Sequence, residues 1–341
     1  MDKLSQIADS IEKLHEIIRD KVLSTCENSS LQQLSEVVHE GKGDTIYSID
    51  RISEELIVEY FEAEVVDIAP VILIAEGISE DGNIVLPSGA SEEDAEFRII
   101  MDPIDGTREI MYQKRSAWIL TGIAPNKGED TSLQDIEFAI QTEIPIVKQH
   151  LSDVVTAYKG KGIEARRYNR LSGKHQPINL QPSSAQSIKH GFAMIARFFH
   201  GARDVLAQIE EEIIRNILGN VESGKALCFE DQYLSTGGQI YELISGHDRF
   251  IADLRPLLEN VMMERGVGLG LCCHPYDLCT ELIAREAGVI ITDEKGNPVK
   301  SKLNVTDNIS WIGFANESIR KEVEPHLVDA LEKHHLIESV A

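Results

Sequence analysis

The sequence has few cysteines, a shortage of basic residues and no long hydrophobic run. Its five cysteines are an odd number and form no Cys-x-x-Cys pair, which argues against a disulfide framework and against a structural zinc site. No apolar run approaches the roughly 18–20 residues that a membrane-spanning helix needs. The first residues, MDKLSQIADSIEKLHEII, mix charged and apolar residues at helical spacing, unlike a signal peptide. We therefore expect a cytoplasmic protein.

Acidic residues dominate the charge of the chain. Lys plus Arg number 33 and Asp plus Glu number 57, which gives a formal net charge of −24. Most of such a surface repels duplex nucleic acid and anionic membranes, so we expect neither a nucleic-acid polymer nor a membrane as partner. A small anionic substrate remains compatible with this charge if bound cations reverse the field locally.

Hydrophobic spacing in the first half of the chain predicts two helices and then a sheet. Apolar residues recur every three or four positions over 4–22 and 49–60, as in amphipathic helices. The spacing then changes to short strand-like runs separated by turn residues, without helices between most of them. This pattern predicts an antiparallel sheet. The runs are 70–75, 97–101, 116–124, 136–142, 151–158 and 162–168.

The second half alternates helical and strand patterns after a Pro- and Ser-containing stretch at 181–187. This alternation predicts an α/β unit. We therefore divide the chain into an α+β domain over 1–183 and an α/β domain over 184–341. The predicted helices are 201–218, 236–245, 277–287 and 316–335, and the predicted strands are 249–254, 288–293 and 310–316.

The segment FRIIMDPIDGTREI (97–110) is the most informative part of the sequence. An apolar strand ends at Asp102, Pro103 favours extended backbone, and Asp105-Gly106 is a turn pair before a helical pattern. Two carboxylates thus leave the end of a strand beside the backbone N–H groups of a helix start, where an anion can bind. The alternative is an ordinary turn that ends a strand.

Three further segments carry a carboxylate at the end of an element. Glu76 follows the apolar run VILIA, Asp277 begins a helical pattern in HPYDLCTELIAREAG, and Asp50 stands at the head of the 49–60 helix. Each has a simple alternative: Glu76 is a solvated strand end, and the two aspartates are helix N-caps.

Taken together, the four segments resemble the inositol monophosphatase family of magnesium-dependent, lithium-sensitive phosphatases. The family motifs read approximately G-D-x-x-T-x-x-D, a Glu-Glu pair after a strand, D-P-[IL]-D-G-T, and W-D-x-A with A-G-G further on. Their order and spacing agree with this chain over roughly its first 300 residues. The matching positions are Gly43-Asp44 through Asp50, Glu76, Asp102 through Thr107, Tyr276-Asp277 and Ala287-Gly288. Gly77, Tyr47 and Tyr276 depart from the motifs. Gly77 and Tyr47 leave open which residues support the ligands and relay the water.

The resemblance implies a role for each matched residue. The implied metal ligands are Glu76, Asp102, the Ile104 carbonyl, Asp105 and Asp277, with Asp102 bridging two ions. Thr107 and Asp50, with Glu76, would orient or deprotonate the attacking water. The backbone N–H groups of Gly106 and Thr107 would hold the phosphate. Ser235, Thr236, Gly237 and Gly238 are candidate substrate contacts, with a helix N-cap as the equal alternative.

The resemblance also implies a fold, a cofactor and a partner. The expected fold is the layered α-β-α-β-α sandwich of inositol monophosphatase and fructose-1,6-bisphosphatase, with the site between the two domains, in a homodimer. Because converging carboxylates repel each other by several kcal/mol per pair and all matched donors are oxygens, we expect hard cations. Two or three Mg²⁺ ions fit best, with Mn²⁺ as a possible substitute.

The expected substrate is a small phosphorylated metabolite. The acidic residue that holds inositol in the inositol-specific branch would fall at Gly270, so inositol 1-phosphate is not expected to be the best substrate. Arg108 could instead bind a second phosphate, or it could be an exposed residue in the first turn of a helix. A 3′(2′),5′-bisphosphate nucleotidase and a sugar bisphosphatase are therefore alternatives. A metal-binding pseudoenzyme and a scaffold that only kept the fold are alternatives of other classes.

Overall fold

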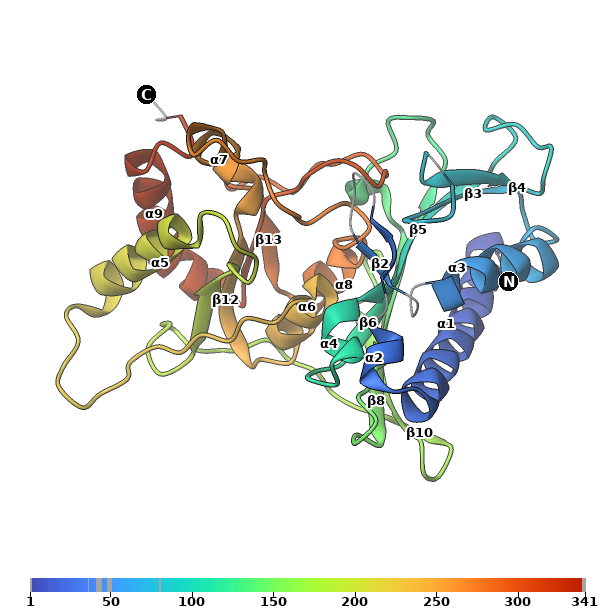
Figure 1. Cartoon of the computed structure of the whole chain (residues 1–341), viewed down its shortest axis with the longest axis horizontal. Helices are drawn as coiled ribbons and strands as arrows, with labels where there is room; N and C mark the ends of the chain where they lie inside the picture. The colour runs from blue at the N-terminus through green and yellow to red at the C-terminus, as the bar shows by residue number, and fades with distance from the viewer. Residues whose placement is uncertain (1, 36, 41–44, 48–50, 80, 339–341) are drawn as a thin grey trace.

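The computed structural model describes the chain apart from residues 1, 36, 41–44, 48–50, 80 and 339–341. Its helices and sheets stack in the order α-β-α-β-α, as Figure 1 shows. In that view α1 (Lys3–Asn28) and α3 (Arg51–Tyr60) form one outer layer. The helices α6 (Thr236–Ile244) and α8 (Glu281–Ala287) lie between the two sheets, and α5 (Arg203–Leu218) and α9 (Glu317–Lys333) form the other outer layer. In the described part of the chain, no helix is both long and apolar enough to cross a membrane.

The first layer consists of α1 (Lys3–Asn28), α2 (Leu31–Leu34), α3 (Arg51–Tyr60) and a π-helical turn (Phe61–Val65). Asp2 begins α1 by accepting a hydrogen bond from the Ser5 N–H. A buried stripe from Ile7 to Val22 then packs against the large sheet. Within that stripe, His15 is fully buried, and its two ring nitrogens bond to Thr142 and Thr121 of the sheet.

The large sheet contains eight strands in the described part of the chain, in the order β10-β9-β8-β7-β6-β5-β3-β4. Its pairs are antiparallel as predicted, except that β3 and β5 run parallel. The strands are β3 (Val71–Ala75), β4 (Asn83–Leu86), β5 (Phe97–Asp105), β6 (Ala117–Pro125), β7 (Phe138–Ile144), β8 (Leu151–Tyr158), β9 (Ile163–Asn169) and β10 (Lys174–Pro177). Separately, β1 (Val37–Glu40) pairs antiparallel with β2 (Thr45–Tyr47). The sequence analysis did not predict β1, β2, β4 or β10.

The smaller sheet has the order β11-β12-β14-β13, with β11 parallel to β12 and the other pairs antiparallel. Its strands are β11 (Phe192–Ile195), β12 (Asp248–Asp253), β13 (Ile290–Thr292) and β14 (Trp311–Phe314). The helices of this half are α5 (Arg203–Leu218), α6 (Thr236–Ile244), α7 (Glu259–Glu264), α8 (Glu281–Ala287) and α9 (Glu317–Lys333). Short 3₁₀ turns cover Leu133–Asp135 and Arg255–Leu258. The division into domains at residue 183 stays a prediction.

The middle helical layer connects the two sheets. α6 packs on β6 of the large sheet and on β12 of the small one, and α8 packs on β8 and β13. Both helices are predominantly apolar where they are buried, and they share one hydrophobic core with the facing strands. The outer pair α5 and α9 closes a second core on the far side of the small sheet. This arrangement brings the start of α6 and the turn before α8 to the end of β5.

Candidate metal centre

A β-bulge aligns the two aspartates at the end of β5. Asp102 pairs with Leu120 of β6 and Asp105 pairs with Trp118, so three steps along β5 oppose two along β6. In a regular strand, residues three apart point to opposite faces, whereas one extra residue restores the same face. Our prediction that the strand ends at Asp102 is wrong. The strand continues to Asp105, because its pairing with β6 resumes there after the bulge. The bulge lets both carboxylates face the same site.

The N-terminus of α6 holds Asp105 in place. The Ser235 hydroxyl and the Gly237 N–H donate to Asp105 Oδ2 at 2.7 and 2.6 Å, and the Thr236 N–H donates to Oδ1 at 3.3 Å. Ser235 is also the N-cap of α6, because it accepts a bond from the Gly238 N–H at 2.8 Å. The N-cap alternative is thus confirmed, and the role of residues 235–238 as substrate contacts stays a prediction.

Gly237 allows α6 to approach the strand this closely. A Cβ at this position would lie 3.0 Å from Asp105 Oδ2 and 2.5 Å from a methyl carbon of Leu120. Any side chain would push α6 away from the strand and weaken the bonds to Asp105. Gly237 is therefore needed for this close contact, whereas a Cβ on Gly238 would meet the Tyr233 ring.

Asp277 completes the group from the other half of the chain. Our prediction that Asp277 begins a helix is wrong, because α8 starts at Glu281 and residues 275–280 form turns. Asp277 Oδ2 accepts the His274 N–H at 2.6 Å, which fixes the side chain within that turn. One oxygen each of Asp102, Asp105 and Asp277 lies within 4.8 Å of the others. Three of the predicted metal ligands therefore meet at one point.

Glu76 directly follows β3, and β3 runs parallel to β5. The Tyr276 hydroxyl donates to Glu76 Oε2 at 3.3 Å, so the residue before Asp277 contacts Glu76. Glu76 stands outside the 4.8 Å group, although its charge contributes to the raised pKa of Asp102. The tyrosine that replaces the family's tryptophan thus bonds to a predicted ligand.

Burial and mutual repulsion make this group costly to ionise without a cation. Burial, followed by the charges of Asp105 and Asp277, raises the pKa of Asp102 well above its usual range. Burial and the charge of Asp277 raise the pKa of Asp105 to about 7, although its three hydrogen bonds act in the opposite direction. The donors are all carboxylate oxygens, which suit a hard divalent ion. The residues present therefore fit the implied cation.

The turn after Asp102 arranges the other predicted groups. Asp102 Oδ1 accepts the Ile104 N–H at 2.9 Å, and the Thr107 hydroxyl donates to the Ile104 carbonyl at 2.9 Å. Gly106 has φ of 90°, a left-handed conformation that favours glycine, and it is the N-cap of the short helix α4 (Thr107–Met111). Arg108 lies with its guanidinium carbon 5.5 Å from the centre of the Phe199 ring. Asp50 lies outside the described residues.

Gln141 is a buried residue of the site that the sequence analysis missed. Its side-chain amide on β7 donates to the Gly237 carbonyl at 2.7 Å and accepts from the Thr280 hydroxyl at 3.3 Å. It therefore links the start of α6, which holds Asp105, to the turn that carries Asp277. A glutamine within the apolar run IEFAIQT was the available signal, because buried amides need partners.

No protein-family model and no curated protein matches this chain. Solved structures do match it over nearly its whole length. A Leishmania major fructose-1,6-bisphosphatase is 14% identical with a TM-score of 0.66, and 97% of this chain and 94% of that chain align. The extragenic suppressor protein suhB of Bartonella henselae is 15% identical with a TM-score of 0.62, covering 94% and 98%.

A hypothetical Pyrococcus horikoshii protein, described as having similarities to inositol-1 monophosphatase, is 16% identical with a TM-score of 0.61, covering 96% and 98%. The chain therefore has the fold that is shared by inositol monophosphatase-like proteins and fructose-1,6-bisphosphatase. The layered α-β-α-β-α sandwich predicted from the sequence is confirmed.

Proposed function

We propose that this protein is a metal-dependent phosphatase that hydrolyses a small phosphate monoester. The observation that carries the proposal is the meeting of Asp102, Asp105 and Asp277 within 4.8 Å, in the fold of inositol monophosphatase and fructose-1,6-bisphosphatase. A scaffold that only kept the fold has no need for three converging carboxylates, one buried and two half-buried, whose mutual repulsion opposes folding. A catalyst that binds cations does need them.

In the proposed reaction, water attacks phosphorus, the bond from phosphorus to the ester oxygen breaks, and the alcohol leaves with a proton while inorganic phosphate remains. Divalent cations at the cluster would activate the water and neutralise charge on the leaving oxygen. We propose Mg²⁺, with Mn²⁺ as a substitute, held by Glu76, Asp102, Asp105, Asp277 and the Ile104 carbonyl. We take the number of ions, two or three, from the resemblance to the inositol monophosphatase family.

Thr107 has the geometry of a residue that orients water. Because its hydroxyl proton is donated to the Ile104 carbonyl at 2.9 Å, its oxygen lone pairs can accept a hydrogen bond from water. The water then presents its own lone pair towards phosphorus, which is the arrangement that attack requires. Asp50 is proposed to assist, and the Gly106 and Thr107 N–H groups are proposed to bind the phosphate.

For the substrate we propose a small polyol, sugar or nucleotide phosphate, with inositol 1-phosphate not the best of them. Gly270 offers no carboxylate where the inositol-specific branch of the family has an acidic residue. On the same resemblance we propose a cytoplasmic homodimer and inhibition by lithium. A k_cat/K_M for inositol 1-phosphate tenfold above that of every bisphosphate tested would contradict the substrate proposal.

Release of phosphate from p-nitrophenyl phosphate tests the activity without assuming a physiological substrate. We expect turnover in Mg²⁺ and its loss in EDTA, with recovery when excess Mg²⁺ is returned. Equal turnover in EDTA and in Mg²⁺ would overturn metal dependence. Absence of turnover despite Mg²⁺ binding, measured by calorimetry, would identify a pseudoenzyme instead.

A further inference from the structure

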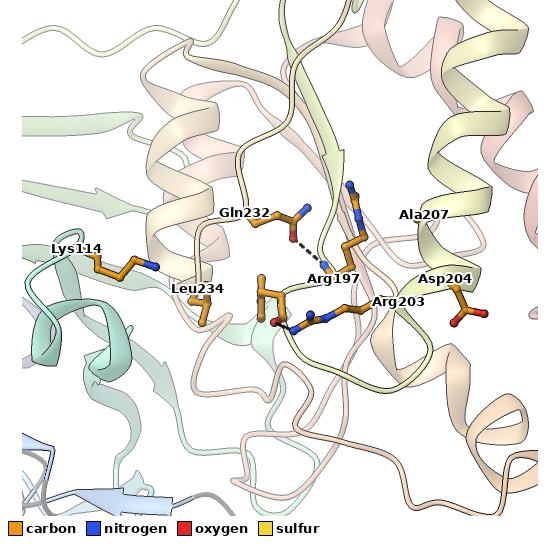
Figure 2. Close-up of a pocket in the computed structure, with 8 residues that line it drawn as sticks. Lys114, Arg197, Arg203, Asp204, Ala207, Gln232 and Leu234 are labelled. Atoms are coloured by element: carbon orange, nitrogen blue, oxygen red, sulfur yellow. Dashed lines mark hydrogen bonds between the residues drawn. The ribbon is translucent and has the colours of Figure 1, made fainter.

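A solvent-open cavity of about 610 Å³ is lined in part by Leu234, the residue before Ser235. Its walls come from the turn after α4, the 197–207 segment that leads into α5, and the 232–234 segment that leads into α6 (Figure 2). In Figure 2, Lys114 and Arg203 point into the cavity from opposite walls, with Leu234 between them. The cavity is large enough for a small substituent of a metabolite.

Leu234 contacts both the cavity and the turn of the proposed phosphate site. Leu234 immediately precedes Ser235, whose hydroxyl donates to Asp105. A Cβ placed on Gly106 would lie 3.4 Å from the Leu234 carbonyl oxygen and 3.1 Å from Ser235 Cβ. The cavity wall therefore touches the Gly106 turn. A group attached to a phosphate at that turn can extend into the cavity.

Two of the four charged residues in the walls are neutralised by neighbours. Arg197 forms ion pairs with Glu210 and Glu230. Asp204 accepts two bonds from Arg265, both at 2.8 Å. Asp204 is thus balanced by Arg265, and Arg197 with its two glutamates carries one net negative charge, so neither residue adds positive charge to the cavity.

The other two charged residues keep their positive charge. Arg203 donates to the backbone carbonyls of Phe199 and Phe198, which are uncharged. Lys114 is exposed and forms no side-chain bond to any residue that the structure describes. In a chain of net charge −24, a cavity with two uncompensated cations is an unusual local reversal of the field.

A buried ion pair supports the wall that carries Arg203. Arg255 pairs with buried Asp253, donates to the Leu271 carbonyl at 2.8 Å, and lies 4.5 Å from the centre of the Phe198 ring. The Phe198–Phe199 carbonyls that orient Arg203 are thereby attached to β12. The guanidinium is held in position before a ligand binds, which lowers the entropy cost of binding.

From this geometry we propose that the cavity binds a second anionic group, a phosphate or a carboxylate, carried by the leaving alcohol, with Lys114 and Arg203 as its specificity-determining residues. This inference rests on the proposed phosphatase function. It narrows the substrate class to phosphate monoesters whose alcohol carries another anion a few atoms away. The acidic cluster accepts the phosphate that is hydrolysed, and the basic cavity selects what is attached to it.

The test compares substrates that differ only in the second anion. Propane-1,3-diol bisphosphate and 3-hydroxypropyl phosphate share the same three-carbon chain, but the alcohol that leaves the first carries a phosphate and the alcohol that leaves the second is neutral. Longer α,ω-diol bisphosphates up to hexane-1,6-diol measure the reach. We expect the ratio of their k_cat/K_M values, bisphosphate over monophosphate, to be about tenfold or more at the best length, equivalent to ~1.4 kcal/mol. The ratio should fall with ionic strength because the cations are exposed.

Substitutions then assign the ratio to the cavity. Lys114→Ala and Arg203→Gln should each lower the ratio about fivefold or more, and the double variant should bring it close to one. Arg203→Lys, which keeps the charge, should retain part of the ratio and guards against a folding defect. The matched control is Lys300→Ala, which removes an exposed lysine outside the cavity and should leave the ratio unchanged.

The outcomes separate the two proposals. Hydrolysis of both substrates with a ratio near one, or a ratio indifferent to Lys114→Ala, would overturn the cavity assignment and leave the phosphatase proposal standing. If neither of these substrates nor p-nitrophenyl phosphate is hydrolysed, the phosphatase proposal fails. The cavity is then decided by calorimetric binding of propane-1,3-diol bisphosphate. Binding at least about fivefold weaker in Lys114→Ala supports the cavity, and equal binding overturns it.

Discussion

The acidic cluster and the basic cavity are neighbours on the 234–235 segment, yet they are built in opposite ways. The cluster gathers Asp102, Asp105 and Asp277, and backbone N–H groups bind all three of them. The cavity uses Lys114 and Arg203, whose exposed side chains extend from loops and helix ends. Because buried carboxylates tolerate little displacement, the cluster is expected to be rigid and sensitive. The cavity can change one residue at a time and alter only the preference among substrates.

Loss of a carboxylate from the cluster should have the largest effect. Asp102→Asn or Asp277→Asn should lower turnover by more than about 10³-fold, because a neutral amide binds a hard cation poorly. Asp329→Asn on the exposed surface of α9 removes the same charge and should have no effect. Turnover of p-nitrophenyl phosphate at saturating Mg²⁺ measures the difference. Near-normal rates in both cluster variants would show that the carboxylates do not hold the ion.

Thr107 should come next in magnitude. Thr107→Ala removes the oxygen that we propose to orient water, and k_cat should fall roughly 10²–10⁴-fold with little change in K_M. Thr107→Ser retains the hydroxyl and its bond to the Ile104 carbonyl, so it should keep most of the activity. Steady-state kinetics of the two variants provide the measurement. A raised K_M with normal k_cat would reassign Thr107 to substrate binding.

Gln141 should have a smaller effect, on cation affinity. Gln141→Leu leaves the Gly237 carbonyl and the Thr280 hydroxyl without their shared partner, so α6 and the Asp277 turn can shift apart. We expect Mg²⁺ or Mn²⁺ binding to weaken about 10-fold, measured by calorimetry, since outer partners of ligands commonly contribute 10–100-fold. Thr280→Val removes only one of the two bonds and should weaken binding less. Unchanged affinity in both variants would make Gln141 a packing residue only.

A further effect is expected on the stability of the metal-free protein. The pKa of Asp105 is raised to about 7 in the folded state, above its usual 3.8. Between those values the folded state keeps a proton that the unfolded state has lost, so the free energy of unfolding falls as pH rises. The loss is complete above about pH 7 and amounts to a few kcal/mol at most, about 1.4 kcal/mol per pKa unit.

The measurement is thermal unfolding of the EDTA-treated protein at pH 5.5 and pH 8. Asp105→Asn should stabilise the metal-free protein at pH 8 relative to wild type and have less effect at pH 5.5. Addition of Mg²⁺ at pH 8 should raise the T_m of the wild type more than that of the variant. A wild-type pH dependence equal to that of Asp105→Asn would show that this carboxyl is not the titrating group.

The two regions also differ in how far the sequence predicted them. D-P-I-D-G-T and the ordered acidic positions indicated the cluster, because oxygen donors at strand ends are a local pattern. The cavity had no such signal. Lys114 and Arg203 are far apart in the chain, and each looks like an ordinary surface cation. We had considered Arg108 as a residue that could bind a second phosphate. It lies near the ring of Phe199, and Phe199 belongs to the 197–207 segment that lines the cavity.

Some local details of the cluster also escaped the sequence. The bulge between Asp102 and Asp105 depends on how β6 pairs with β5, and the start of α8 at Glu281 depends on the His274–Asp277 turn. The secondary-structure propensities of the residues alone predict neither the bulge nor the start of α8. The N-cap at Ser235 was foreseen as an alternative, but its second bond, to Asp105, required the docking of α6 on the large sheet.

The sequence by itself determined the elements and the chemistry of this protein: apolar periodicity set most helices and strands, and the acidic motifs set an oxygen-donor site. The tertiary structure decided which of those residues meet. Asp277 reaches Asp102 only because α6 and α8 pack between two sheets, and Gln141 ties their ends together. Lys114 and Arg203 face one cavity only because α4 ends and α5 begins beside it. Contacts between distant segments depend on burying a shared core, which no local pattern records.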